Sequence, residues 1–310
     1  MALSRPAAML AMGDGRERMA VLTLQRPRAQ RGGSAELFSW YFLRVSGVLL
    51  VVLALGHIFI THYLNVPSET TTGFVTARWR NPLWRTFDWL LLTMALWHGL
   101  NGLRLSVDDY LHRPGLRVAA QAAVWVLALI FTALGSVTIF TFNHEQQDRG
   151  PLNDQRWIAT LIDGSLVLVA FITYFATLAL LIWVATILAR GGVPLYWGDA
   201  GQYAWVLHRA TGLGVLFFLL VHIVDIALIG LGRDLYDETV AYYATPFLIP
   251  MEIALVGAVI YHSLNGIRIL LIDFWNVGGT RYERQLFYVM LALTIALTLP
   301  SAILIISHVL

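Results

Sequence analysis

The chain has 310 residues, 58% of them hydrophobic and 13% charged, and its mean hydropathy is +0.67. Soluble domains average about 45–50% apolar and about 25% charged residues, so this composition indicates an integral membrane protein. A net charge of +2 is too small to favour nucleic acid as a partner. The 21 basic residues are all Arg and Cys is absent, which excludes disulfides, thiolate-held iron–sulfur clusters and c-type haem.

The pattern of apolar runs predicts an all-α fold with seven transmembrane helices, because each run can span about 30 Å of hydrocarbon. The runs lie near residues 40–64, 85–105, 118–142, 158–189, 204–231, 247–272 and 285–308. Residues 1–36 come before the first long run, and we interpret them as an Arg-rich tail that stays attached.

The distribution of Arg predicts the orientation in the membrane. When alternate loops are assigned to one face, 15 Arg fall on the face of the N-terminus and 6 on the other. The positive-inside rule then places the N-terminus in the cytoplasm and the C-terminus outside a bacterial or archaeal cytoplasmic membrane. Six of the 15 belong to the tail, so the short loops contribute less to this bias.

Two motifs occur twice in the chain. Arg44-Val45-Ser46-Gly47 precedes His57 by the same distance at which Arg209-Ala210-Thr211-Gly212 precedes His222. The segment His98–Arg104 matches His262–Arg268 at five of seven positions, and an Asp (Asp109 or Asp273) follows each five residues later. The offset between the copies is 165 residues for the first motif and 164 for the second, which indicates an internal repeat.

Each predicted repeat has three spans, an odd number, so a chain with two parallel repeats needs one extra span between them. We therefore expect two parallel three-helix repeats, related by an axis along the membrane normal and joined by the helix near 158–189. The expected organisation is a tail (1–36), a first repeat (37–145), a linker with the extra helix (146–195) and a second repeat (196–310).

Each repeat places two histidines inside the bilayer, where an imidazole is costly unless it is hydrogen-bonded or binds a ligand. An inter-helix hydrogen bond would satisfy a single His, but four at matching positions favour ligation. At 1.5 Å of rise per residue, His57 lies about 20 Å along its helix from Arg44, and His98 lies about 9 Å from Arg104. We therefore expect two sites at different depths: an inner pair, His98 with His262, and an outer pair, His57 with His222.

Two facing imidazoles without a nearby carboxylate pair suit a bis-histidine haem b better than zinc or a di-iron centre, which need more ligands. Two such haems would form an electron path across the membrane. Glycines next to these histidines would let a flat porphyrin approach the backbone, although they also suit ordinary helix packing.

These residues carry a resemblance to the membrane subunits of succinate dehydrogenase. The second half resembles the cytochrome b subunit, through the segment Leu207–Gly212, His222, the segment Tyr261–Arg268 and Asp273-Phe274. The first half resembles the hydrophobic anchor subunit, through the segment Phe42–Gly47, His57, His98 and Asp109-Tyr110. The family usually has two separate chains, so the resemblance implies a fusion. His57 and His222 match its two-haem branch, which is associated with menaquinone.

The resemblance implies that this chain anchors a flavoprotein and an iron–sulfur subunit, which carry succinate oxidation, and passes electrons to a quinone. It also implies a quinone site at Arg209 and at the Asp109-Tyr110 pair. Trp205 stands where some relatives have a serine, so it belongs to this site or closes it. Positive-inside anchoring by Arg209 and an aromatic-belt role for Tyr110 are the alternatives.

Four further residues are candidates by position. Asp225 and Glu252 fall in the predicted outer half, where membrane carboxylates can relay protons or form salt bridges. His208 and Arg44 lie near the inner pair, where they could contact a haem propionate. His62 lies near a helix end, where water could satisfy it.

Three other functions are alternatives. A secondary transporter also suits parallel repeats, but it would favour helices broken near the midplane, whereas Pro82, Pro194 and Pro246 fall at helix ends. The paired His-x-Leu-Asn-Gly motif argues against another kind of respiratory cytochrome b. A fumarate reductase anchor, the same machine run in reverse, has the same sequence features.

Overall fold

The computed structural model describes residues 33–143, 200–275 and 280–308, and every regular element among them is helical. Two units are distinguished, residues 1–40 and 41–310. The predicted helix near 158–189 lies outside the described residues, as does most of the tail.

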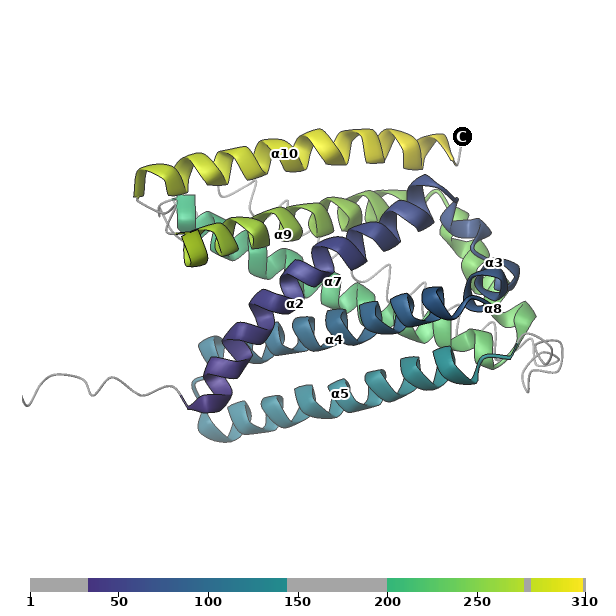
Figure 1. Cartoon of the computed structure of the whole chain (residues 1–310), viewed down its shortest axis with the longest axis horizontal. Coiled ribbons are helices and arrows are strands. Elements are labelled where there is room, and N and C mark those ends of the chain that lie inside the picture. Colours follow the sequence, from purple (N-terminus) through teal and green to yellow (C-terminus); the bar gives the residue numbers. More distant parts are fainter. Residues whose placement is uncertain (1–32, 144–199, 276–279, 309–310) are drawn as a thin grey trace, which may run out of the picture. The chain divides into compact units, whose positions relative to one another are not determined.

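Six long helices cover most of the described chain (Figure 1). They are α2 (Ser34–Ile58), α4 (Pro82–Tyr110), α5 (Pro114–Thr141), α7 (Ala200–Ala227), α9 (Ile249–Trp275) and α10 (Thr280–Ser307). Within the described residues, five of them (all but α4) are long and apolar enough to cross a membrane. α4 matches the predicted span near 85–105, but it carries Arg85, Asp88, Arg104, Asp108 and Asp109. The chain is thus an all-helical, multi-pass membrane protein.

Local sequence signals explain where two of these helices begin. The Asn81 side chain accepts a hydrogen bond from the Leu83 amide at 2.9 Å, and Pro82 follows at the first helical position of α4. Pro114 occupies the same position in α5. Pro suits this position because its missing N–H would have no partner there in any case.

Short helices connect α2 to α4 and α7 to α9, and the apolar runs gave no indication of them. After α2 come the π-helical turn η1 (Phe59–Tyr63), the 3₁₀ turn η2 (Pro67–Glu69) and α3 (Thr72–Trp79). After α7 come η4 (Leu228–Gly230), α8 (Arg233–Ala241) and η5 (Tyr242–Ala244). α3 contacts α8. We call this the far end of the bundle, and we call the opposite end, with Arg44 and Arg209, the arginine end.

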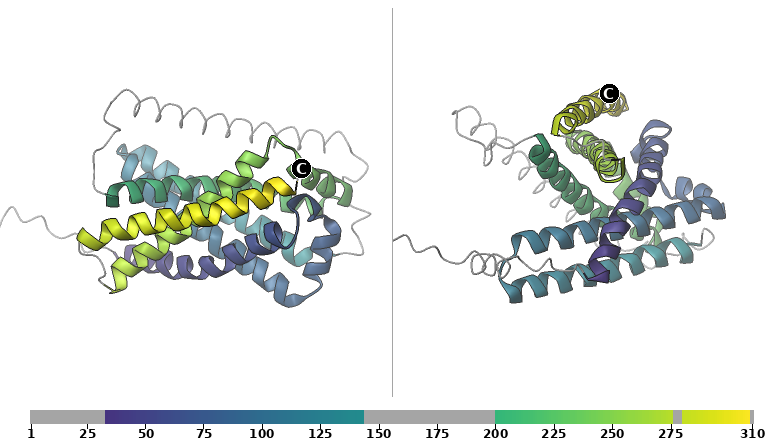
Figure 2. Two further views of the ribbon diagram at one scale, coloured as in Figure 1. Left: turned by 90° about the horizontal axis from the view of Figure 1, so that it is seen from above. Right: turned by 60° about the vertical axis from the view of Figure 1, so that its left-hand side comes forward.

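Close helix packing joins α4 to α5 and α9 to α10, and both pairs run side by side (Figures 1 and 2). A Cβ added at Gly135 would lie 2.6 Å from the Leu92 side chain, so α5 approaches α4 through a position that only Gly leaves open. Gly99 of α4 has a similar role, because an added Cβ would lie 2.8 Å from Leu216 of α7. Small residues at helix contacts are typical of membrane bundles.

α2 is packed much less densely than the other spans. Only 6% of its most apolar window is buried inside the chain, compared with 17–33% for the other four candidate spans. Polar side chains of α2 and η1 instead reach α4, α7, α9 and α10, and these contacts define the candidate sites.

Candidate functional site

The predicted inner pair is formed by His98 of α4 and His262 of α9. Their ring centroids lie 6.2 Å apart and their planes cross at 85°. The Ser46 hydroxyl donates to the Phe42 carbonyl at 2.6 Å, so its contact of 2.9 Å with Nδ1 of His98 leaves it as the acceptor. Nδ1 of His262 lies 3.0 Å from the His208 carbonyl, which can only accept. Both neutral rings therefore carry their proton on Nδ1, and each Nε2 lone pair is left for a ligand.

One glycine from each repeat lies against these rings. An added Cβ at Gly47 would lie 3.6 Å from Cε1 of His98, an ordinary contact, whereas at Gly212 it would lie 2.7 Å from Cε1 of His262. The two positions are equivalent in the repeat, but only the second requires the absence of a side chain.

We expect Gly212→Ala to displace the His262 ring, while Gly47→Ala leaves His98 in place. Overpacking of this kind costs about 1–3 kcal/mol. The absorption spectrum and cofactor content of the purified chain would check this, with Gly47→Ala as the matched control. Equal behaviour of the two variants would contradict the asymmetry of the contacts.

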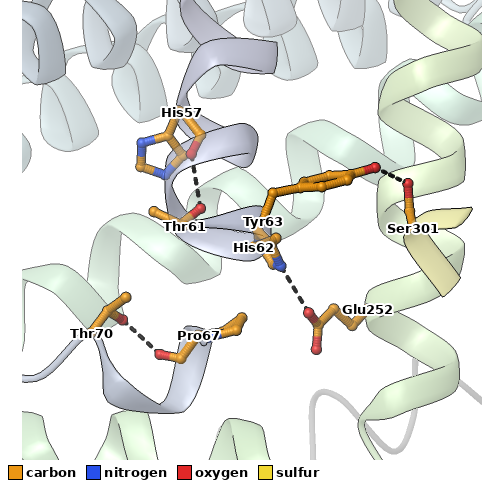
Figure 3. Close-up of polar contacts among 8 residues, drawn as sticks. All are labelled: His57, Thr61, His62, Tyr63, Pro67, Thr70, Glu252 and Ser301. Carbon is orange, nitrogen blue, oxygen red and sulfur yellow. Dashed lines mark hydrogen bonds and ion pairs between the residues drawn. The ribbon is translucent and has the colours of Figure 1, made fainter. Parts of the chain in front are cut away.

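The predicted outer pair is formed by His57, in the last turn of α2, and His222 of α7. Their centroids lie 6.1 Å apart and their planes cross at 70°. Phe218 stacks on His222 with centroids 5.5 Å apart. Thr61 donates to the His57 carbonyl at 2.9 Å, and Nδ1 of His57 is buried without a hydrogen-bond partner among the described residues (Figure 3). The sequence thus predicted both pairs correctly as spatial neighbours.

The separation of both pairs fits two imidazoles that share one metal ion. With a metal–nitrogen bond of about 2 Å and about 1.1 Å from Nε2 to the ring centroid, two axial imidazoles have centroids about 6 Å apart. Edge-to-face packing of aromatic rings covers a wider range, about 4.5–7 Å. The fixed Nδ1 protons of the inner pair also fit ligation through Nε2.

His208 lies against the face of His262, one member of the inner pair. Its ring stacks on that of His262 with centroids 3.9 Å apart and an interplanar angle of 7°. Nδ1 of His208 is buried and has no hydrogen-bond partner within the described part of the chain. The first repeat has Leu43 at the equivalent position, so this imidazole belongs to one repeat only.

Three of the four residues predicted for a quinone site come together at the arginine end. Arg209 forms an ion pair with Asp109, and its guanidinium carbon lies 4.1 Å above the Trp205 ring. Nη1 of Arg209 is buried and has no hydrogen-bond partner in the described residues. Tyr110, the last residue of α4, is 61% exposed.

A second Arg–Asp pair repeats this contact in the opposite direction. Arg44 of the first repeat binds Asp273 of the second through Nε at 3.1 Å and Nη2 at 2.8 Å. Arg209 of the second repeat binds Asp109 of the first. The two repeats therefore exchange equivalent ion pairs, which is the pattern expected for a two-fold relation between them.

The two acidic candidates at the far end have separate partners. Tyr243 of η5 donates to Asp225 at 2.6 Å, and Asp225 is only 3% exposed. Burial and the neighbouring Asp225 carboxylate raise the pKa of Tyr243 well above its usual value, so the phenol keeps its proton. Glu252 pairs with Nδ1 of His62 at 2.8 Å (Figure 3). Nothing in the sequence indicated Tyr243, which lies in a short helix outside the apolar runs. The sequence also predicted water as the partner of His62, because Glu252 is 190 residues away in the chain.

Comparisons with known proteins identify the family of this chain. A model of the succinate dehydrogenase/fumarate reductase transmembrane subunit family matches residues 20–135 and 194–300, more than half of the chain. The succinate dehydrogenase 2 membrane subunit SdhC of Mycobacterium tuberculosis is 40% identical over 127 residues, which are 40% of this chain and 93% of the relative. The succinate dehydrogenase hydrophobic membrane anchor subunit of Halobacterium salinarum is 31% identical over 104 residues, 33% of this chain and 78% of the relative. The chain therefore belongs to the succinate dehydrogenase/fumarate reductase transmembrane subunit family and is a membrane subunit of that class of complex.

Proposed function

We propose that this chain fuses both membrane subunits of a succinate:quinone oxidoreductase, with the anchor-like repeat in 37–145 and the cytochrome b-like repeat in 196–310. The family model matches once in each half, and the mycobacterial relative needs only 40% of this chain to cover 93% of itself. The exchanged Arg–Asp pairs support two parallel repeats. Two parallel repeats of three spans each then require the extra helix predicted near 158–189, which gives seven spans in total.

The observation that carries the function is the pair of imidazole contacts between the repeats, at 6.1 and 6.2 Å. We infer that His98 and His262 hold an inner haem b and that His57 and His222 hold an outer one. A bis-histidine haem supplies one-electron transfer when it is bound. The protein holds the rings through Ser46 and the His208 carbonyl, which fix the Nδ1 protons.

Two polar groups fit a role toward haem propionates near the inner pair. His208 presents a buried Nδ1 without a partner in the described residues, beside the His262 ring. Arg44 already forms an ion pair with Asp273, which partly neutralises its charge. We therefore assign the closer contact to His208 and a longer-range electrostatic role to Arg44.

The quinone, which we take to be menaquinone, is proposed to bind at the arginine end next to Arg209, Asp109, Tyr110 and Trp205. The buried Nη1 of Arg209 is a donor that a quinone carbonyl can accept from. The Trp205 ring and the Asp109 carboxylate fix the guanidinium from two sides, which pre-organises it. This end faces the cytoplasm in the proposed orientation, where the flavoprotein and iron–sulfur subunits would dock.

Substitution of Arg209 tests this site. We expect Arg209→Gln to raise the KM for a quinone analogue by about 10-fold or more, because a lost hydrogen bond from a charged donor costs about 1.5–3 kcal/mol. Tyr110→Phe should raise it by about 2- to 10-fold, because a hydrogen bond from a neutral donor contributes about 0.5–1.5 kcal/mol. The measurement is quinone reduction by the complete complex, with ubiquinone and menaquinone analogues. Arg113→Gln, an exposed Arg at the same end, is the control. An unchanged KM in both site variants would contradict the assignment, and running the assay in reverse distinguishes succinate oxidation from fumarate reduction.

At the far end we propose that Asp225 and Glu252 carry protons for the outer site. Asp225 lies one turn beyond His222, and Glu252 reaches the end of α2 through His62. Buried carboxylates in a membrane protein are natural proton carriers.

A further inference from the structure

Two carboxylates occupy equivalent positions in the two repeats. Asp88 lies ten residues before His98 near the start of α4, and Glu252 lies ten residues before His262 near the start of α9. Both side chains are mostly buried at the far end, with exposed fractions of 13% and 15%. Two-fold related positions with the same charge would be expected to have the same kind of partner.

Their partners differ in chemistry. Asp88 accepts from Nε and Nη2 of Arg78, both at 2.7 Å, and from the Trp79 indole at 2.9 Å. A guanidinium stays charged at every physiological pH, so this pair is fixed. Within the described part of the chain, the Glu252 carboxylate is held by the His62 imidazole alone. An imidazole can both accept and donate a proton, so this pair can exchange one.

The position of His62 also differs from that of an ordinary helical residue. It lies in η1, a π-helical turn at the end of α2, and such turns are frequent at functional sites. The next residue, Tyr63, is hydrogen-bonded to Ser301 of α10, and the Asn65 amide donates to the Ile60 carbonyl at 2.8 Å. These contacts hold the turn so that His62 faces α9 (Figure 3).

We propose that His62 and Glu252 form the proton-exchange pair of the far-end site, and that the equivalent Asp88 is a fixed structural ion. The side chain of His62 is 19% exposed, so the pair can reach water without being fully solvated. When negative charge is added between His57 and His222, the pair takes up one proton from the water outside, with His62 becoming an imidazolium beside the carboxylate. This inference rests on the proposed two-haem function and names the residue that makes it respond to pH.

Other charged and titratable groups surround the pair. His57 and His222 lie on α2 and α7, and Asp225 of α7 is bound to Tyr243 of η5. Asp88 of α4 is neutralised by Arg78 of α3. The phenol of Tyr243 keeps its proton and the Arg78–Asp88 pair is fixed, so neither of these groups takes up the proton in place of the His62–Glu252 pair.

The test is potentiometric titration of the far-end haem in the complete complex at several pH values. One proton taken up with one electron shifts the midpoint potential by up to about 59 mV for each tenfold change in proton concentration. We expect a clear slope in the wild type, at least half of it lost in His62→Gln and in Glu252→Gln, and partial retention in Glu252→Asp. Glu69→Gln, which removes an exposed carboxylate at the same end, should keep the slope. A wild-type slope in both His62→Gln and Glu252→Gln would overturn the inference and leave the haem assignment intact.

A second readout does not require haem. Infrared difference spectra of the full chain between about pH 5 and 8, with isotope-labelled histidine and glutamate, should show coupled imidazole and carboxylate bands that His62→Gln and Glu252→Gln both abolish. Bands that survive in either variant would refute the pair. If the chain binds no haem but these bands behave as expected, the proposed function fails and the proton-exchanging pair stands.

Discussion

Replacing His57 or His222 with alanine is expected to remove one of two b-type haems from the purified chain and to leave the other in place. The two rings approach each other from α2 and α7 at 6.1 Å, so each variant would delete one of the two imidazoles proposed to hold the same haem. His98→Ala and His262→Ala should likewise leave one haem, at the other site. A pyridine haemochrome count with dithionite-reduced minus oxidised spectra, in mild detergent, measures the result.

The matched control is His112→Ala. His112 lies in the connection between α4 and α5, where its Nδ1 lies 3.0 Å from the Tyr110 carbonyl, and it should keep both haems. A wild-type chain with a single haem would make His57 and His222 packing residues. A chain without haem would refute all four ligand assignments.

The internal repeat explains why so much of the site could be predicted. Offsets of 165 and 164 residues placed the motifs in one register, and a two-fold relation then paired His57 with His222 and His98 with His262. The length of the apolar runs also predicted the six long helices that the structure describes, to within several residues at each end. The long helices depend on the local sequence, and the pairing of the histidines depends on the symmetry of the repeat. Both can be read from a single sequence.

The features that were missed depend on contacts between distant segments. His62 and Glu252 are 190 residues apart, and their contact requires the π-helical turn, which no apolar run indicates. α3 and α8 are too short and too polar to stand out as spans. Nothing in the sequence indicated the exchanged Arg–Asp pairs either. The positive-inside rule relates each Arg to a face of the membrane and not to a residue of the other repeat.

Breaking the fixed ion pair at the far end is expected to destabilise the protein strongly. Arg78 and Asp88 have side chains only 9% and 13% exposed, and Arg78 also lies 4.3 Å above the Trp84 ring. Asp88→Asn would leave the guanidinium in a poorly solvated site, which costs about 3–5 kcal/mol in comparable buried pairs. We therefore expect a marked fall in Tm, measured by thermal unfolding in detergent.

Two further variants test whether the expected loss of stability comes from the unpaired charge of Arg78. Arg233→Gln breaks the Arg233–Asp237 pair, whose Arg is 52% exposed and whose distance is 3.6 Å, so it should change stability by only about 0–1 kcal/mol. Arg78→Leu combined with Asp88→Leu removes both charges and should be less harmful than Asp88→Asn alone, because no ion remains unpaired. If the double variant were as unstable as Asp88→Asn, packing around Trp79 and Trp84, and not the buried charge, would account for the loss. If Asp88→Asn unfolded at the wild-type temperature, the pair could not be the fixed anchor that distinguishes the first repeat from the second at this end.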